Sequence, residues 1–365
     1  MASKLPTIPE EVMTADASVQ TDPSDASEPT YTIVTQNGTT YFIPSPRETP
    51  EAAEHELAPP PPELRNGFYP IPIPGFQHVN LFNACEEGRI RNVWEHNLYE
   101  EFQIIRSLIR RGFNHISMDT EFPGIVANPI AKFDSVYEYK YQRLRANVDM
   151  LNIIQIGLTF YDEFGNNPMG ISTWQFNFKF NLEDEMYAQE SIQQLKNSGI
   201  HFQRHEIDGI EWRKFSEFFI SSGCVLNDNV KWISFHGGYD FAYLVKVLSD
   251  QKLPETETEF FELLKIYFPF CYDVKYLMKS CKDLAGGLVE IAHQLDVPRV
   301  GYKHQAGSDS LVIGIAFFRM KHIHYDNTIE DAKYNGRLYG FESSYTEKDE
   351  AKPTDVQSTA APDNN

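Results

Sequence analysis

The 365-residue sequence has little cysteine, no long apolar run and no excess of basic residues. Its four cysteines, Cys85, Cys224, Cys271 and Cys281, have no metal-ligand or redox spacing, which predicts reduced, buried thiols in a cytosolic or nuclear protein. No run of 18 apolar residues is present, so we expect no helix that spans a bilayer. The first residues lack the apolar core of a signal peptide, so we do not expect secretion. The formal charge of −20 argues against a globally basic nucleic-acid binder.

The negative charge and the prolines are concentrated outside the middle of the chain. Residues 1–76 carry three Lys or Arg, eleven Asp or Glu and 14 of the 22 prolines. Such a segment buries too little apolar surface to offset its ordering entropy, and we predict that it is largely disordered. Within it, two alternating β-branched and aromatic runs flank an Asn-Gly pair, which predicts a β-hairpin at residues 31–43. Residues 341–365 have the composition of a second disordered acidic tail.

Residues 77–340 remain as one predicted folded domain with a net charge of −8. The whole chain is 41% apolar and 13% aromatic, enough for a sizeable core. We expect strands at 115–122, 153–162, 173–180 and 231–235. We expect helices at 86–111, 137–151, 257–267, 286–295 and 306–324. A further helix should begin at 239, and two or three more should lie within 185–222. This order favours an α/β fold with a mixed sheet and helices on both faces.

Two acids lie on the first of these strands. Asp119 and Glu121 are two residues apart, so a strand places both side chains on the same face. Two adjacent carboxylates repel each other unless a cation lies between them, and their oxygens suit Mg²⁺ or Mn²⁺. Taken alone, this pattern is weak and favours two solvated acids on an exposed edge.

Asp240 follows a strand-to-helix junction that contains Gly237 and Gly238. An acid there is explained either by the helix dipole or by a ligand that approaches the two glycines closely. His236 fits a structural histidine.

His304 and Asp309 precede and begin an apolar helix. If the helix starts at Ala306, Asp309 lies in its first turn and faces the sheet, and His304 lies on the preceding loop. A histidine at such a position suits a mobile base, because its ordinary pKa of about 6.5 allows proton transfer near neutral pH. A first-turn helix acid and a surface histidine are the alternatives.

Taken together, these motifs resemble the DEDD exonuclease superfamily, of the subtype with histidine in the last motif. The sequence resembles one family in particular, the Caf/Pop-type poly(A) deadenylases, which are catalytic subunits of the carbon-catabolite-repression–NOT complex. The resemblance covers about residues 80–340. It is carried by the segments 93–102, 117–124, 174–178, 238–241, 304–311 and 331–340.

The resemblance implies a ribonuclease H-like mixed sheet and removal of 3′-terminal adenylates from mRNA as 5′-AMP, which promotes mRNA decay and translational repression. It implies two divalent ions, Mg²⁺ or Mn²⁺ with Zn²⁺ or Co²⁺ as substitutes. The ions would hold the nucleophile and the leaving oxygen for an in-line displacement at the phosphodiester. By matching position, Asp119, Glu121, Asp240 and Asp309 are the implied metal ligands and His304 the general base. Asp326 matches a further acidic metal-contact position at which relatives have Glu.

The implied partners are single-stranded poly(A) RNA, the NOT scaffold subunit, a leucine-rich-repeat deadenylase and Tob/BTG-type adaptors, with no membrane. The implied location is the cytoplasm, including processing bodies, and the nucleus. Two alternatives stay open: another exonuclease of this subtype that acts on general RNA or DNA, and a non-catalytic scaffold subunit.

Overall fold

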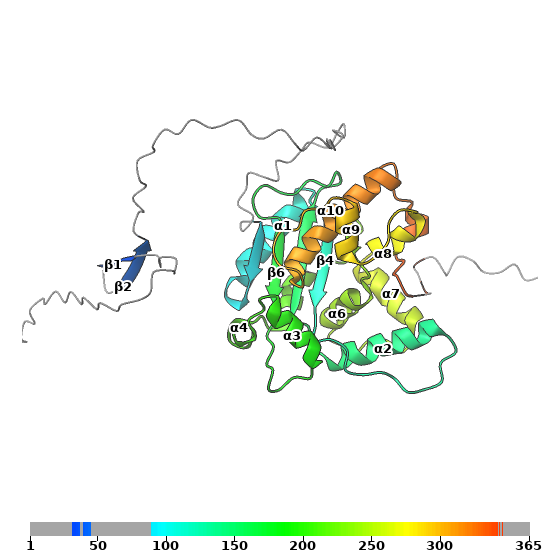
Figure 1. Cartoon of the computed structure of the whole chain (residues 1–365), viewed down its shortest axis with the longest axis horizontal. Helices are drawn as coiled ribbons and strands as arrows, with labels where there is room; N and C mark the ends of the chain where they lie inside the picture. The colour runs from blue at the N-terminus through cyan, green and yellow to red at the C-terminus, as the bar shows by residue number, and fades with distance from the viewer. Residues whose placement is uncertain (1–30, 37–38, 45–88, 342, 344, 346–365) are drawn as a thin grey trace, which may run out of the picture. The chain divides into compact units, whose positions relative to one another are not determined.

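The computed structural model describes residues 31–36, 39–44, 89–341, 343 and 345. The chain divides into two units, Met1–Ile73 and Pro74–Asn365, and each is described by itself. In the first unit, β1 (Tyr31–Gln36) pairs with β2 (Thr39–Pro44) in antiparallel register (Figure 1). The hairpin expected at 31–43 is therefore confirmed. The other predictions for residues 1–76, the domain start at 77 and the tail from 346 lie outside the described residues.

The second unit contains a six-stranded mixed sheet in the order β3-β6-β5-β4-β7-β8. β3 is parallel to β6, the β6-β5-β4 meander is antiparallel, and β7 and β8 continue from β4 in parallel. The strands are β3 (Ile90–Val93), β4 (His115–Glu121), β5 (Gln155–Tyr161), β6 (Thr173–Asn177), β7 (Lys231–Ser234) and β8 (Phe270–Asp273).

Helices cover both faces of this sheet. The helices α1, α2, α5, α6 and α7 pack with one face into the larger apolar core, and α8, α9 and α10 pack on the other face, where α10 crosses the central strands (Figure 1). This is the mixed, helix-flanked, ribonuclease H-like architecture that the sequence predicts. The helices are η2 (Glu95–Asn97), α1 (Leu98–Arg110), α2 (Val136–Met150), α3 (Gln189–Asn197), α4 (Phe202–Asp208), α5 (Trp212–Ile220), α6 (Gly238–Ser249), α7 (Glu257–Tyr267), α8 (Val274–Leu277), η3 (Met278–Ser280), α9 (Leu288–Gln294), α10 (Ala306–His324) and α11 (Asp331–Tyr334). None of the described helices is both long and apolar enough to cross a membrane.

The period-2 pattern of β4 sorts its side chains between the two faces. Ile116 and Met118 are fully buried in the larger core. The opposite face, which carries Asp119 and Glu121, is covered by α10, and the Ser117 hydroxyl donates a hydrogen bond to the Ser310 carbonyl (2.7 Å). The acids therefore lie at the edge of a sheet–helix interface and not on an open face.

Most expected elements differ from the observed ones by a few residues at their ends, and three differences are larger. The helix predicted at 86–111 begins only at Leu98, because residues 90–93 form an edge strand beside β6 and the Asn97 side chain accepts the Trp94 N–H (2.8 Å). The strand β8 was missed, since four residues are too short for a periodicity. The predicted tail begins too early, because Phe341 and Tyr345 pack on the core and the Tyr345 hydroxyl donates to the Phe268 carbonyl (2.9 Å).

Candidate active site

The last residues of β4 place two carboxylates where the sheet meets the first turn of α10. Asp119 and Glu121 are half-buried and share the face that α10 covers. Ligand atoms of Glu121, His304 and Asp309 all lie within 4.8 Å of one another. Two motifs separated by more than 180 residues in the chain therefore converge, as the sequence predicts.

Asp240 reaches the same region from the turn between β7 and α6. His236 in this turn has a left-handed backbone with φ 60°, and Gly238 begins the helix. The Asp240 side chain is buried, and its Oδ1 accepts a hydrogen bond from the Thr120 hydroxyl at 2.5 Å. Thr120 lies between the two acids of β4 in sequence, and its side chain points to the opposite face of the strand. The charge of Asp240 nevertheless acts on both Asp119 and Glu121, which places the third acid near the first two.

Asp309 lies in the first turn of α10, whose start at Ala306 agrees with the prediction. Its Oδ2 accepts the backbone N–H of His304 (2.9 Å), and its Oδ1 accepts a hydrogen bond from the Arg299 guanidinium (2.6 Å). His304 itself is exposed, with a left-handed backbone of φ 59°. One carboxylate thus fixes the loop that presents the imidazole at the mouth of the cluster.

The electrostatics show that these acids share one environment. Burial, followed by the carboxylates of Asp240, Asp309 and Glu121, raises the pKa of Asp119 well above its ordinary value, while Arg299 opposes this shift. The pKa of Glu121 is raised well above its ordinary value by burial and by the charges of Asp309 and Asp240. Burial is the main cause that raises the pKa of Asp240 to about 7. Carboxylates arranged in this way favour either bound protons or bound cations.

Two buried amides that the sequence analysis missed anchor the first turn of α10. The Ala306 N–H donates to Gln155 Oε1 (3.3 Å), and the Gly307 N–H donates to Gln175 Oε1 (3.0 Å). Because the first N–H groups of a helix have no partner within it, buried side chains must satisfy them. The β5 backbone also approaches closely, since a Cβ on Gly157 would lie 1.9 Å from the Ala306 carbonyl oxygen. The sequence contained one sign of these amides, because polar residues alternate with the aromatic residues of β6.

Asp273, at the end of β8, is a second residue that the sequence analysis missed. Its side chain is 1% exposed and accepts three backbone N–H groups, from His236 (2.8 Å), Lys275 (2.9 Å) and Tyr339 (2.8 Å). Burial raises its pKa, and these N–H donors oppose the shift. The carboxylate holds the His236 turn in place and therefore sets the start of α6 and the position of Asp240.

The structure does not bring Asp326 to the cluster. It follows the C-terminal end of α10, is exposed, and has a left-handed backbone with φ 47°. A helix rises about 1.5 Å per residue, so Asp309 and His324 are roughly 22 Å apart along the axis. The expectation that Asp326 is a metal ligand is therefore wrong for this geometry, because a rigid helix separates it from the other acids.

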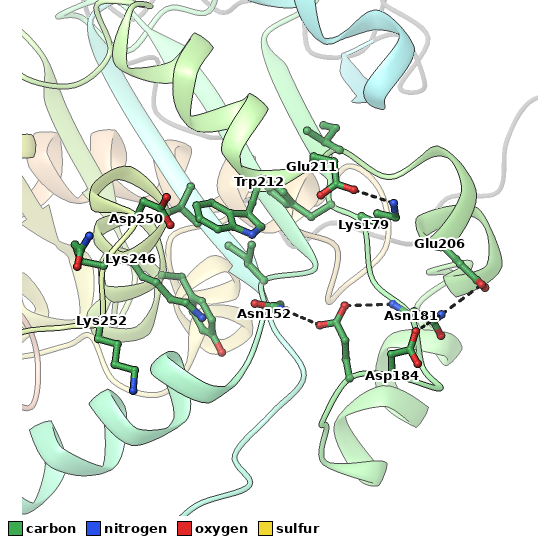
Figure 2. Close-up of a pocket in the computed structure, with 17 residues that line it drawn as sticks. Asn152, Lys179, Asn181, Asp184, Glu206, Glu211, Trp212, Lys246, Asp250 and Lys252 are labelled. Carbon is green, nitrogen blue, oxygen red and sulfur yellow. Dashed lines mark hydrogen bonds and ion pairs between the residues drawn. The ribbon is translucent and has the colours of Figure 1, made fainter.

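Two hollows flank this region. An open one of 630 Å³ contains His304 and residues of α3. A second one of 660 Å³ contains none of the predicted site residues. Figure 2 shows that its side chains are largely engaged with one another, since Glu185 accepts the Asn152 amide (2.9 Å) and Lys179 pairs with Glu211 (2.8 Å).

A family model described as CAF1 family ribonuclease matches residues 93–221 and 224–317. The chain belongs to the CAF1 ribonuclease family. It is 51% identical over 255 residues to the poly(A) ribonuclease pop2 of Schizosaccharomyces pombe, which covers 70% of this chain and 76% of that protein. It is 47% identical over 268 residues to the probable CCR4-associated factor 1 homolog 7 of Arabidopsis thaliana, which covers 72% of this chain and 96% of that protein.

Solved CAF1 structures have the same fold. The Mg²⁺- and Mn²⁺-bound form of S. pombe Pop2p is 51% identical, has a TM-score of 0.67, and covers 69% of this chain and 99% of that one. A yeast CAF1 structure, co-crystallised with the NOT1 MIF4G domain, is 34% identical with a TM-score of 0.59, and covers 71% of this chain and 100% of that one. The chain is thus a ribonuclease by family, and its carboxylate cluster lies inside the matched region.

Proposed function

We propose that this chain is a 3′–5′ poly(A)-specific exoribonuclease that shortens mRNA tails and releases 5′-AMP. The observation that carries the proposal is the cluster of Glu121, His304 and Asp309, whose ligand atoms lie within 4.8 Å of one another. The charges of Asp119 and Asp240 act on the same group of carboxylates. The relatives named poly(A) ribonuclease and CCR4-associated factor support the choice of substrate.

The donor set fits divalent cations. Carboxylate oxygens are the ligands of hard ions such as Mg²⁺ and Mn²⁺, and the mutual repulsion of these four acids is relieved when cations are bound. We infer that two ions occupy the site, held by Asp119, Glu121, Asp240 and Asp309. When bound, such ions activate a water and stabilise the charge of an in-line phosphodiester displacement.

The side chains of this chain prepare the remaining steps. His304 lies at the exposed mouth of the cluster, where its imidazole accepts the proton of the attacking water. Asp309 orients the His304 loop through the backbone N–H, and Thr120 orients Asp240. The position of His304 beside an open hollow leaves room for a single-stranded 3′ end.

We infer a place in the NOT assembly from the yeast CAF1 that was crystallised with the NOT1 MIF4G domain. The NOT scaffold subunit is the partner this supports directly. A leucine-rich-repeat deadenylase and Tob/BTG-type adaptors extend the same proposal, as does a location in the cytoplasm, including processing bodies, and the nucleus. In that setting, tail shortening promotes mRNA decay and translational repression.

The proposal is tested with the full chain on four 5′-labelled substrates: an RNA ending in A₂₀, RNAs ending in mixed sequence or U₂₀, and DNA ending in dA₂₀. We expect stepwise release of 5′-AMP from the A₂₀ tail with Mg²⁺ or Mn²⁺, with Zn²⁺ and Co²⁺ as further arms, and none with EDTA. Asp119→Asn should abolish it. Equal rates on all substrates would favour a general exonuclease, and no activity with any metal would favour a scaffold subunit.

A further inference from the structure

The hollow beside His304 is built from one helix. Its wall consists of α3 side chains, including Gln189, Gln193, Gln194 and Asn197, and His304 also lines it. With a volume of 630 Å³ it has room for more than one nucleobase. Among the described residues that line it, one is an acid and none is Lys or Arg. Such a lining suits an uncharged ligand rather than a phosphate.

Both ends of α3 are tied to segments that lie next to site residues in the sequence. At the N-terminal end, the Ala188 N–H donates to the carbonyl of Pro123, two residues after Glu121 (2.8 Å). At the C-terminal end, the Gln305 amide donates to the Ser198 carbonyl (2.7 Å). These contacts hold the α3 wall beside the segments that carry Glu121 and His304.

The exposed amides on α3 repeat every four residues, at Gln189, Gln193 and Asn197. Residues four apart lie on one helix face, about 6 Å apart along the axis. The Gln193 Nε2 donates to Asn197 Oδ1 (3.0 Å). This bond leaves the Gln193 carbonyl oxygen as an acceptor and the Asn197 NH₂ as a donor, side by side. Adenine presents the complementary pair, a 6-amino donor next to a ring-nitrogen acceptor.

We propose that this hollow is the base-binding subsite for the 3′-terminal nucleotides of the tail, and that Gln193 and Asn197 select adenine by pairing with its edge. The inference rests on the proposed exonuclease function and names its specificity-determining residues. Single-stranded RNA is recognised through base edges of this kind, and Asn or Gln amides match adenine in two hydrogen bonds. Uracil places an acceptor and an N–H donor where adenine has the reverse, so it pairs poorly with the same amides.

The test compares the full-length wild type with the Gln193→Ala/Asn197→Ala double variant and with Asn197→Asp. The substrates are 5′-labelled RNAs of one body sequence whose last two nucleotides are AA or UU, with Mg²⁺. The readout is the ratio of kcat/KM for the two ends, which does not depend on the fraction of folded enzyme. We expect the AA-over-UU ratio to fall roughly tenfold in both variants, mainly through loss on AA ends.

The matched control is Gln203→Ala, which removes an exposed glutamine from α4, outside the hollow, and should leave the ratio unchanged. A ratio that stays at the wild-type value in the two α3 variants would overturn the inference, whether activity is kept or falls equally on both ends. That result would leave the proposed function intact. A wild type that cleaves neither end would instead remove the proposed function, and the subsite with it.

Discussion

The two ends of α10 are built differently, although one helix joins them. At the N-terminal end, small and polar residues are buried and hydrogen-bonded. Ser310 contacts Ser117 and Thr159 of the sheet, and Asp309 contacts Arg299 of the loop before α10. The C-terminal half of α10 packs through apolar side chains that include buried phenylalanines, and it ends at exposed residues. Buried polar groups cost free energy unless they are partnered, so they are retained where they perform chemistry.

The largest effect is expected when the charge at the N-terminal end is removed. Asp309→Asn keeps the size of the side chain but removes one of the four carboxylates and the ionic partner of the Arg299 guanidinium. We expect kcat on an A₂₀ tail to fall about 10²- to 10³-fold, as removal of a group that stabilises the transition state does. Single-turnover assays with saturating Mg²⁺ measure this loss. Activity within tenfold of the wild type would show that Asp309 is not a ligand.

Asp273→Asn tests a residue outside α10 that positions Asp240 through backbone hydrogen bonds. Its carboxylate accepts three N–H groups, whereas an amide offers one acceptor and places an NH₂ against a donor. We expect the activity to fall about 10- to 100-fold, with a higher Mg²⁺ concentration for half-maximal rate, because the His236 turn and Asp240 shift.

The control for Asp273 is Asp331→Asn, which replaces the charged acceptor of a hydrogen bond from Tyr272, the neighbour of Asp273 on β8, by a neutral one. It should lower the unfolding temperature without changing the Mg²⁺ dependence. If both variants require the same Mg²⁺ concentration as the wild type, Asp273 serves only stability.

Gly157→Ala probes the close contact between β5 and the start of α10. The added methyl group would overlap the Ala306 carbonyl, and neither backbone can move away without breaking the bonds to Gln155 and Gln175. Overpacking of this kind costs roughly 1–3 kcal/mol, or several degrees in the unfolding temperature.

Calorimetry compares the unfolding temperatures of Gly157→Ala and Gly170→Ala, and Gly170→Ala is the control. A methyl group added at Gly170 would have no other atom within 4 Å, but this residue has φ +82°, so its substitution costs about 1 kcal/mol of backbone strain and leaves α10 in place. Activity should fall in the first variant only. Equal activity in both would mean that the start of α10 tolerates displacement.

The sequence predicted the parts of this fold and site that depend on local patterns. The bounds of α7 agree with the expected 257–267, because an amphipathic repeat follows a capping box formed by Thr256 and Glu259. Asp119 and Glu121 share a face because strand geometry requires it. The start of α10 and the position of Asp309 in its first turn follow from helix geometry in the same way.

The parts that were missed depend on partners distant in the chain. Gln155 and Gln175 gain their role only when Ala306 and Gly307, more than 130 residues later, are placed against them. The role of Asp273 likewise depends on Tyr339, 66 residues away. No periodicity in one segment contains this information, since it exists only in the packed sheet.

Metal binding should stabilise the protein in a pH-dependent way. The folded-state pKa of Asp240 is about 7, above its ordinary value of 3.8, so the folded metal-free protein binds this proton more tightly than the unfolded chain does. Stability from this group is therefore greatest at low pH and is lost as the pH rises from about 4 to 7. Asp119 and Glu121 act in the same direction. Cations bind the deprotonated carboxylates and recover this loss.

We expect 10 mM Mg²⁺ to raise the unfolding temperature by several degrees at pH 8 and by less than about one degree at pH 5. Differential scanning fluorimetry with EDTA as the reference measures the shift. In the Asp119→Asn/Glu121→Gln double variant the Mg²⁺ shift at pH 8 should disappear. A shift of equal size at both pH values would place the cations elsewhere on the protein.

Asp326→Asn should have the smallest effect, and it sharpens the comparison between the ends of α10. The side chain is exposed, and asparagine tolerates the left-handed backbone at φ 47°, so neither packing nor strain changes. We expect kcat/KM and the Mg²⁺ dependence to stay within twofold of the wild type, in the same assays as Asp309→Asn. A loss comparable to that of Asp309→Asn would mean that Asp309 and Asp326 bind the same ion. That result would contradict the structure, in which the length of α10 separates the two acids.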